Sequence, residues 1–215
     1  MISGKRPTMP QHTTLPADHR REQFFDALKN NLGLLFGIVL IFWGVEIVDT
    51  VLRGALDQFG VQPRRLSKLS GILTSPFLHG DFGHLISNTI PFLILGGIVL
   101  IGGRKIFIIA SILIIVLGGS ALWLLGPPNT NHIGASSLIF GYLGFLLARG
   151  IVERSGFWIV ISLIVLGVYG SMIFGVLPGQ PGISWQGHLF GFLSGIAVAW
   201  MLFAKDKIDD RRSIT

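Results

Sequence analysis

The sequence predicts an all-α polytopic membrane protein built as a bundle of six transmembrane helices. Half of its 215 residues are hydrophobic, only 13% are charged, and the mean hydropathy is +0.66. A soluble domain of this length would carry far more charge on its surface. Apolar stretches of nearly membrane-spanning length recur along the chain, without the two-residue alternation of a transmembrane β-barrel. There is no cysteine, which excludes disulfides and thiol chemistry.

The apolar stretches divide the chain into three parts. Residues 1–30 are polar, contain three prolines and have no apolar core, so we expect a flexible tail rather than a signal peptide. Residues 31–204 form the predicted membrane domain, and residues 205–215 form a second short tail. The six predicted spans are residues 31–52, 84–102, 105–125, 135–149, 157–177 and 188–204.

The basic residues predict the orientation of these spans. With the N-terminus in the cytoplasm, thirteen of the 17 Lys and Arg residues lie on the cytoplasmic side. The positive-inside rule therefore predicts both termini in the cytoplasm, as in a protein of the bacterial plasma membrane. The formal charge of +6 does not indicate nucleic-acid binding, because the chain has no basic stripe or recognition motif.

Under this orientation, the loops outside the membrane differ in length and in charge. Residues 53–83 form one long external connection rich in turn-forming residues. The other two outer loops, residues 126–134 and 178–187, carry no charged residue. An uncharged loop can lie below the lipid headgroups where protein surrounds it.

Small residues form stripes on two of the predicted spans, a pattern typical of closely packed membrane helices. The last span has glycines at intervals of four: Gly187, Gly191 and Gly195. The fourth span carries the stripe Gly134, Ser137, Gly141, Gly144 and Ala148. We expect these two helices to pack against one another.

Two adjacent serines begin the fourth span, in the segment NHIGASSLIFGYLGF, residues 131–145. The helix from Ser136 to Arg149 is about 20 Å long, against a hydrocarbon core of about 30 Å. If Arg149 lies at the cytoplasmic face, Ser136 lies roughly 10 Å below the outer face by the same arithmetic. His188 starts the last span from the same side, so we expect both side chains to be submerged.

These side chains suit acyl-transfer chemistry. Serine is an effective nucleophile once a base takes its proton, and histidine is the usual base. The outer end of the predicted bundle collects Ser136, Ser137, His79, His84, Asn88, His132 and His188. His84 and Asn88 are spaced i, i+4 and therefore share one helix face.

Carboxylates are scarce in the same region. A Ser–His–acid triad would have to use one of four residues: Glu46, Asp49, Asp57 or Asp81. We therefore favour a dyad of Ser136 and His188, with the imidazole oriented by packing. Glu46 is interpreted as a structural residue that faces the bundle interior.

Structural interpretations compete with the catalytic one. Ser136 could serve only for close packing or bond the carbonyl one turn earlier, and His84 and Asn88 could join neighbouring helices. A metal site made of His79, His84 and Asp81 is disfavoured, since the chain has no HExxH helix and no carboxylate near His188 in sequence. We predict no metal and no cofactor.

Taken together, the motifs resemble those of the rhomboid intramembrane serine proteases over about residues 31–204. HGDFGHLISN fits the His-x-x-x-Asn pattern at His84 and Asn88, with His79 as the upstream loop histidine. GASS stands where the family has Gly-x-Ser-Gly and implies Ser136 as the nucleophile. GHLFGFLSG fits His-x-x-Gly-x-x-x-Gly and implies His188 as the base, followed by Gly191 and Gly195.

The resemblance implies cleavage of single-pass transmembrane protein substrates in the lipid bilayer, near their outer end and without a cofactor. It also implies oxyanion stabilisation by His84, Asn88 and the backbone N–H of Ser136. Two positions depart from the family pattern. Ser137 replaces the glycine after the nucleophile, and LSGILTS replaces a Trp-Arg pair in the first external loop.

Two alternatives remain beside the protease. One is a catalytically inactive rhomboid-like protein that binds transmembrane clients, and the other is a small transporter, which would line several spans with charge. The joint presence of Ser136, His84, Asn88 and His188 favours the protease. Because Ser137 continues the small-residue stripe, we assign it to helix packing rather than to chemistry.

Overall fold

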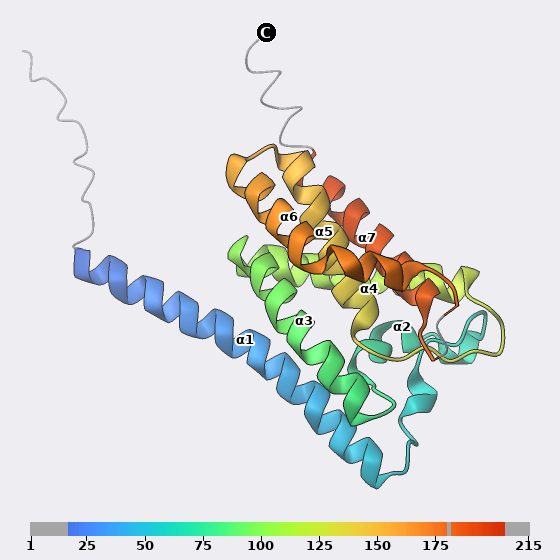
Figure 1. Ribbon diagram of the computed structural model, residues 1–215. Coiled ribbons are helices and arrows are strands. Elements are labelled where there is room, and N and C mark those ends of the chain that lie inside the picture. The colour runs from blue at the N-terminus through green and yellow to red at the C-terminus, as the bar shows by residue number, and fades with distance from the viewer. Residues whose placement is uncertain (1–16, 180–181, 205–215) are drawn as a thin grey trace, which may run out of the picture.

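The computed structural model describes residues 17–179 and 182–204, and within them it is all helical apart from one isolated β-bridge. Six helices are long and apolar enough to cross a membrane, which confirms the predicted fold class. The helices are α1 (Ala17–Val51), α3 (Phe82–Ile101), α4 (Arg104–Leu125), α5 (Ser136–Glu153), α6 (Gly156–Tyr169) with its 3₁₀ continuation η4 (Gly170–Val176), and α7 (Trp185–Phe203). Figure 1 shows their arrangement. Residues 1–16 and 205–215 of the expected tails lie outside the described residues.

Helix α1 begins at Ala17, earlier than the predicted start at residue 31. Residues 17–30 contain no proline or glycine and are rich in Ala, Glu, Gln, Leu, Lys and Arg, which favour helix. The helix therefore continues beyond the apolar stretch, and only Lys29–Val51 is apolar enough to cross a membrane. Part of the segment expected to be a tail is helical.

Helix α5 is the centre of the bundle. Thirteen of its 18 residues are buried, and α3, α4, α6 and α7 all pack against it. In Figure 1, α5 lies between α6 and α7. A helix surrounded in this way can hold polar groups away from lipid, since its neighbours rather than hydrocarbon contact them.

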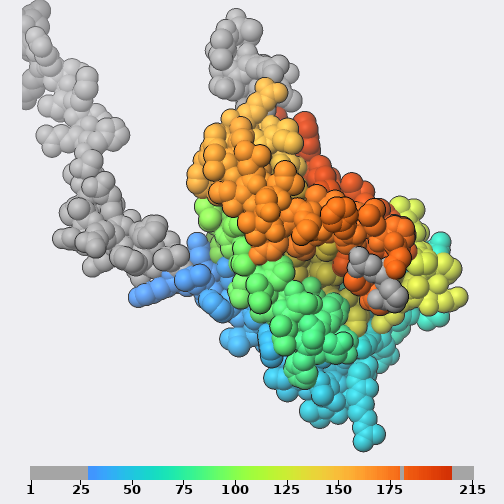
Figure 2. Space-filling view, in the orientation of Figure 1, coloured from blue at the N-terminus to red at the C-terminus, as the bar shows by residue number. Residues whose placement is uncertain are grey.

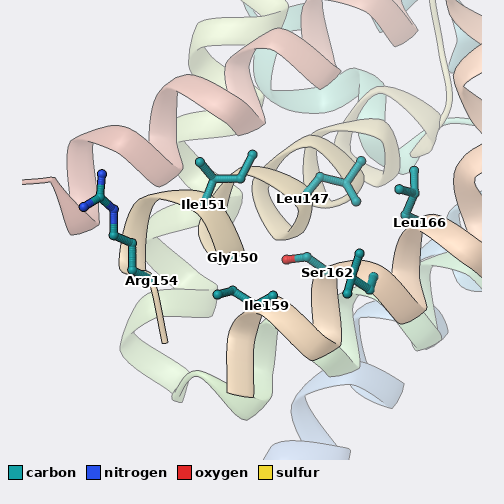
Figure 3. A pocket seen from close by; sticks show the side chains of 8 residues that line it. Leu147, Gly150, Ile151, Arg154, Ile159, Ser162 and Leu166 are labelled. Atoms are coloured by element: carbon teal, nitrogen blue, oxygen red, sulfur yellow. The ribbon is translucent and has the colours of Figure 1, made fainter. Parts of the chain in front are cut away.

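Helix α6 lies at the periphery. It buries only Trp158 and Val165, and in Figure 2 α6 and η4 (orange) run across the visible face of the molecule. A groove of about 420 Å³ opens between α5 and α6, lined mostly by apolar side chains, with Ser162 and Arg154 as its polar members (Figure 3). The groove lies along the second half of α5, away from Ser136.

Helix α5 runs to Glu153, one turn beyond the predicted end at Arg149. Arg149 is only 4% exposed, because its guanidinium lies 3.4 Å from the ring centroid of Trp158 and bonds Glu153 at 2.6 Å. An arginine enclosed by an aromatic ring and a carboxylate need not reach the membrane surface. Ser136 and Glu153 are 17 positions apart, which is about 26 Å along the helix. Helix length alone therefore no longer places Ser136 roughly 10 Å below the outer face.

The long connection between α1 and α3 folds into short helical segments: η1 (Asp57–Phe59), η2 (Leu66–Lys68), α2 (Gly71–Thr74) and η3 (Ser75–Phe77). Its α2 segment packs against α4. Val61 forms the isolated bridge with His132, through N–H···O bonds of 2.9 and 3.0 Å. The connection therefore lies against the loop that precedes α5.

Candidate active site

Ser136 is the first residue of α5, and the turn before it leaves its backbone N–H free. The N–H of Gly134 donates to the carbonyl of Ser75 at 2.9 Å, and the N–H of Ala135 reaches Nε2 of His79 at 3.5 Å. No hydrogen bond joins the Ser136 N–H to any of the described residues. The first N–H groups of a helix have no partner within it, so this donor can bind an anion.

His84 and Asn88 reach the same turn from α3. Asp81 caps α3 by accepting the His84 N–H at 2.8 Å, which fixes the start of that helix. A Cβ placed on Gly134 would lie 2.6 Å from Cε1 of His84 and 3.5 Å from Nδ2 of Asn88. Both side chains therefore lie within a few ångströms of the residue two positions before Ser136.

Asn88 presents an unpaired donor at this place. The residue is 5% exposed, and its Nδ2 atom is buried without a hydrogen-bond partner among the described residues. A buried amide without a partner costs free energy, on the order of 1–3 kcal/mol. Unsatisfied donors of this kind are typical of sites that complete their hydrogen bonds when a substrate binds.

His188 lies in the first turn of α7, and both its orientation and its tautomer follow from its contacts. Nδ1 lies 3.0 Å from the carbonyl oxygen of Gly175. A carbonyl can only accept, so Nδ1 carries the proton and Nε2 of the neutral ring is left as the free base. The ring also lies flat on Phe140, with centroids 4.1 Å apart and planes 9° from parallel.

The Gly175 carbonyl is available because of its place in η4. A 3₁₀ carbonyl bonds the N–H three residues later, and that residue is Pro178, which has none. The sequence pattern indicated neither Gly175 nor Phe140. Phe140 could have been noticed, since it follows Ser136 by four residues and so shares its helix face. The Gly175 carbonyl could not have been noticed, since every residue has a backbone carbonyl and the sequence does not mark which one bonds His188.

Backbone-to-backbone contact joins α5 and α7 just below Ser136 and His188. A Cβ on Gly191 would collide with the carbonyl of Ser137, and one on Gly195 would collide with the carbonyl of Gly141. Gly144 likewise leaves room for the carbonyl of Phe192. The two helices on which the sequence predicted small-residue stripes are thus in close contact, as expected from those stripes.

Ser137 lies on this contact. A Cβ on Gly187 would be 2.8 Å from the Ser137 hydroxyl, so that hydroxyl points toward the start of α7. Phe140, on which the His188 ring stacks, follows Ser136 by four residues and Ser137 by three, so it neighbours both serines on the helix surface. The Ser137 side chain therefore lies in the close contact between α5 and α7.

His79 contacts the turn that precedes Ser136, through the Ala135 N–H. It is 1% exposed, with its ring 5.2 Å from that of His84. Burial, and then the neighbouring His84, lower the pKa of His79 to about 4. The neutral ring can therefore accept the Ala135 N–H at neutral pH.

None of the four carboxylates considered for a triad bonds His188. Asp81 caps α3, Asp49 accepts the Leu56 N–H at 2.6 Å, Asp57 begins η1, and Glu46 is buried at 4% exposure. Within the described ranges, no carboxylate bonds His188, and no three His, Asp or Glu side chains are placed to hold a metal ion.

The fold defines a polytopic helical membrane protein whose polar side chains meet at one end of the bundle. Residues 66–205 match the Rhomboid domain, and the chain belongs to the rhomboid family. An uncharacterized protein of Mycobacterium tuberculosis is 42% identical over 177 residues, 79% of this chain and 74% of that protein. RHOMBOID-like protein 4 of Arabidopsis thaliana is 29% identical over 144 residues, 62% of this chain and 34% of its own. Rhomboid-type serine protease 2 of Emericella nidulans is 29% identical over 130 residues, 57% and 24% of the two chains.

Proposed function

We propose that the protein is an intramembrane serine protease that cleaves single-pass transmembrane proteins with a Ser136–His188 dyad. One observation carries the proposal. The Nδ1 proton of His188 is bound by the Gly175 carbonyl, which leaves Nε2 as a base, and the ring stacks on Phe140, one helical turn after Ser136. Membership of the rhomboid family, with relatives named serine proteases, supports the same function.

In the proposed reaction, Ser136 Oγ attacks the scissile carbonyl carbon while His188 Nε2 takes the hydroxyl proton. His188 then gives this proton to the departing amine nitrogen, which leaves an acyl ester on Ser136. Water attacks the ester with His188 again as base, and the carboxylate product is released. Gly175 stabilises the imidazolium through its carbonyl, in the place where many hydrolases use a carboxylate.

The developing oxyanion needs donors that are not already used. The Ser136 N–H and the Nδ2 atom of Asn88 both lack partners among the described residues, and Nδ2 lies close to Gly134, two residues before Ser136. We propose that these two groups, with His84, bind the oxyanion. Loss of one such donor typically slows a hydrolase by about a hundred- to a thousandfold, and Asn88→Ala should fall in that range.

The proposed orientation has both termini in the cytoplasm and the start of α5 toward the outside. Because the chain has no cysteine, single-cysteine variants give an unambiguous test. Gln58→Cys in the long connection should react with an impermeant maleimide in intact cells. Lys105→Cys, at the opposite end of the bundle, should react only after lysis. The reverse pattern would contradict this topology.

Purified protein in liposomes, mixed with a generic single-pass substrate, tests the proposed activity. Ser136→Ala and His188→Ala should each abolish cleavage, because the two residues act as a unit. Ser137→Gly is the matched control and should cleave normally. A fluorophosphonate probe should label Ser136, as peptide mapping would show.

Two outcomes would overturn the assignment. Labelling at Ser137 would make the wrong serine the nucleophile. Absence of labelling and cleavage, together with retention of the substrate on the protein, would favour a catalytically inactive rhomboid-like protein that binds transmembrane clients.

A further inference from the structure

His132, in the loop before α5, uses both of its ring nitrogens. Nε2 lies 2.7 Å from the Thr130 hydroxyl, and Nδ1 lies 2.6 Å from the Ser184 hydroxyl. The residue is 9% exposed, and its own backbone is paired with Val61 in both directions. This imidazole therefore joins the loop that leads to Ser136 with the residue that precedes α7.

The direction of each hydrogen bond follows from the hydroxyls. The single hydrogen of Thr130 Oγ1 is donated to the carbonyl of Pro127 at 2.7 Å. Nε2 of His132 must therefore donate to Thr130, and Nδ1 of the neutral ring must accept from Ser184. Burial lowers the pKa of His132, which favours this neutral form.

Ser184 completes the chain of bonds by capping α7. Its oxygen accepts the Gly187 N–H at 3.2 Å while its hydrogen is donated to His132. Capping residues of this kind hold the first turn of a helix in place. His188 lies in that first turn of α7.

The link has the same position relative to both members of the proposed dyad. His132 precedes Ser136 by four residues, and Ser184 precedes His188 by four residues. The hydrogen bond between His132 and Ser184 thus joins the two entry segments just before the nucleophile and the base. The glycine contacts between α5 and α7 follow Ser136 and His188 along the two helices, so the dyad lies between these contacts and the hydrogen bond.

We propose that His132 is a positioning residue: through Ser184 it fixes the first turn of α7, and with it the His188 imidazole, relative to Ser136. This inference rests on the proposed function. His132 contacts no reacting atom in this scheme. It acts on the geometry between base and nucleophile, so its loss should lower kcat and leave KM nearly unchanged.

Two substitutions break the link from its two sides. His132→Phe keeps a flat ring and the backbone pairing with Val61 but removes both side-chain bonds. Ser184→Gly removes the hydroxyl at a capping position where glycine is well tolerated. Each should slow fluorophosphonate labelling of Ser136 and lower kcat by roughly 2- to 13-fold, the effect of losing one hydrogen bond. The double variant should be less impaired than the product of the two single effects, because both variants remove the same bond between His132 and Ser184.

Two further variants separate positioning from general damage to the loop. Ser184→Thr keeps the hydroxyl and should restore most of the rate. Asn131→Ala removes the neighbouring loop bond, from Asn131 Nδ2 to the carbonyl of Asp57 at 2.7 Å, without touching α7. It should cleave at the normal rate. If Asn131→Ala slows labelling as much as His132→Phe does, or if His132→Phe stays within twofold of the unmodified protein, the inference is wrong.

Nitrogen NMR of histidine-labelled protein gives a test that does not depend on activity. At neutral pH the His132 ring should show a protonated Nε2 and an unprotonated Nδ1. The His188 ring shifts should move in His132→Phe and in Ser184→Gly but not in Asn131→Ala. Unmoved His188 shifts would overturn the positioning role. Failure of the unmodified protein to label at Ser136 would instead overturn the proposed function and leave the NMR result to decide the inference.

Discussion

The imidazole of His188 lies flat against the phenyl ring of Phe140, with ring centroids 4.1 Å apart and an interplanar angle of 9°. Phe140 follows Ser136 by one helical turn, so the aromatic ring is a platform one turn below the proposed nucleophile. Together with the Nδ1–H···O bond to Gly175, this stacking restricts rotation of the imidazole. The base is therefore oriented by a ring and a backbone carbonyl, each supplied by a different helix.

Replacement of Phe140 should loosen the proposed base. Phe140→Leu keeps an apolar side chain but removes the flat surface, and aromatic pairs contribute about 0.5–1.5 kcal/mol beyond their buried area. If that stabilisation serves the reaction, kcat should fall roughly 2- to 13-fold. Phe157→Leu, which changes an exposed aromatic residue of α6, is the control and should leave kcat unchanged. Equal kinetics for both variants would mean that the stacking has no catalytic role.

Gly134 should be irreplaceable for reasons of both conformation and space. Its φ of +114° is rarely adopted by other residues, and an added Cβ would lie 2.7 Å from Nε2 of His84. Gly103 has a similar φ of +109° with nothing within 4 Å, so it isolates the conformational effect. Both alanine variants should lose about 1–3 kcal/mol of stability, but only Gly134→Ala should also lose fluorophosphonate labelling in its folded fraction. Normal labelling of that fraction would remove His84 from the proposed oxyanion site.

The contact between α5 and α7 should not tolerate a methyl group. In Gly191→Ala the new Cβ would meet the backbone carbonyl of Ser137, which cannot move without shifting α5. Overpacking of this kind typically costs about 1–3 kcal/mol, so the thermal midpoint in detergent should drop by several degrees. Gly167→Ala, on α6 with open space around it, should be neutral or stabilising by up to about 1 kcal/mol. A drop of similar size in both would show that the contact with the Ser137 carbonyl is not the cause.

The stability of the protein should depend on the protonation of His79. Burial holds its pKa at about 4 in the folded protein, against an ordinary value of 6.5. Below pH 6.5 the unfolded chain binds a proton that the native chain does not, so the free energy of unfolding falls as the pH drops toward 4. The largest loss from this residue is about 3 kcal/mol.

Thermal unfolding between pH 7 and pH 4.5 would measure this effect. His79→Gln keeps an acceptor for the Ala135 N–H but does not titrate, and its stability should vary less with pH. An identical pH dependence in the variant and the unmodified protein would show that other groups are responsible.

Hydropathy and small-residue spacing alone determined much of this architecture. Most ends of the six spans were predicted to within a few residues, because the position of a span depends on the local run of apolar side chains. The close approach of α5 and α7 was predicted from glycines such as Gly191 and Gly195, since a missing side chain is itself the feature that permits contact. The two mismatched ends also have local causes. Helix-favouring residues extend α1 back to Ala17, and Arg149, which was placed at the cytoplasmic face, is covered by Trp158 while α5 continues to Glu153.

Only the tertiary structure decided how the polar groups are oriented. His188 could be recognised from its sequence, but its tautomer depends on the Gly175 carbonyl, and every residue has a carbonyl. The same holds for the bond between His132 and Ser184, which joins residues 52 positions apart. Periodicity and composition describe what one segment does with water or lipid. A hydrogen bond between distant segments requires its two atoms to be placed to within a few tenths of an ångström. Such placement exists only once the helices have packed.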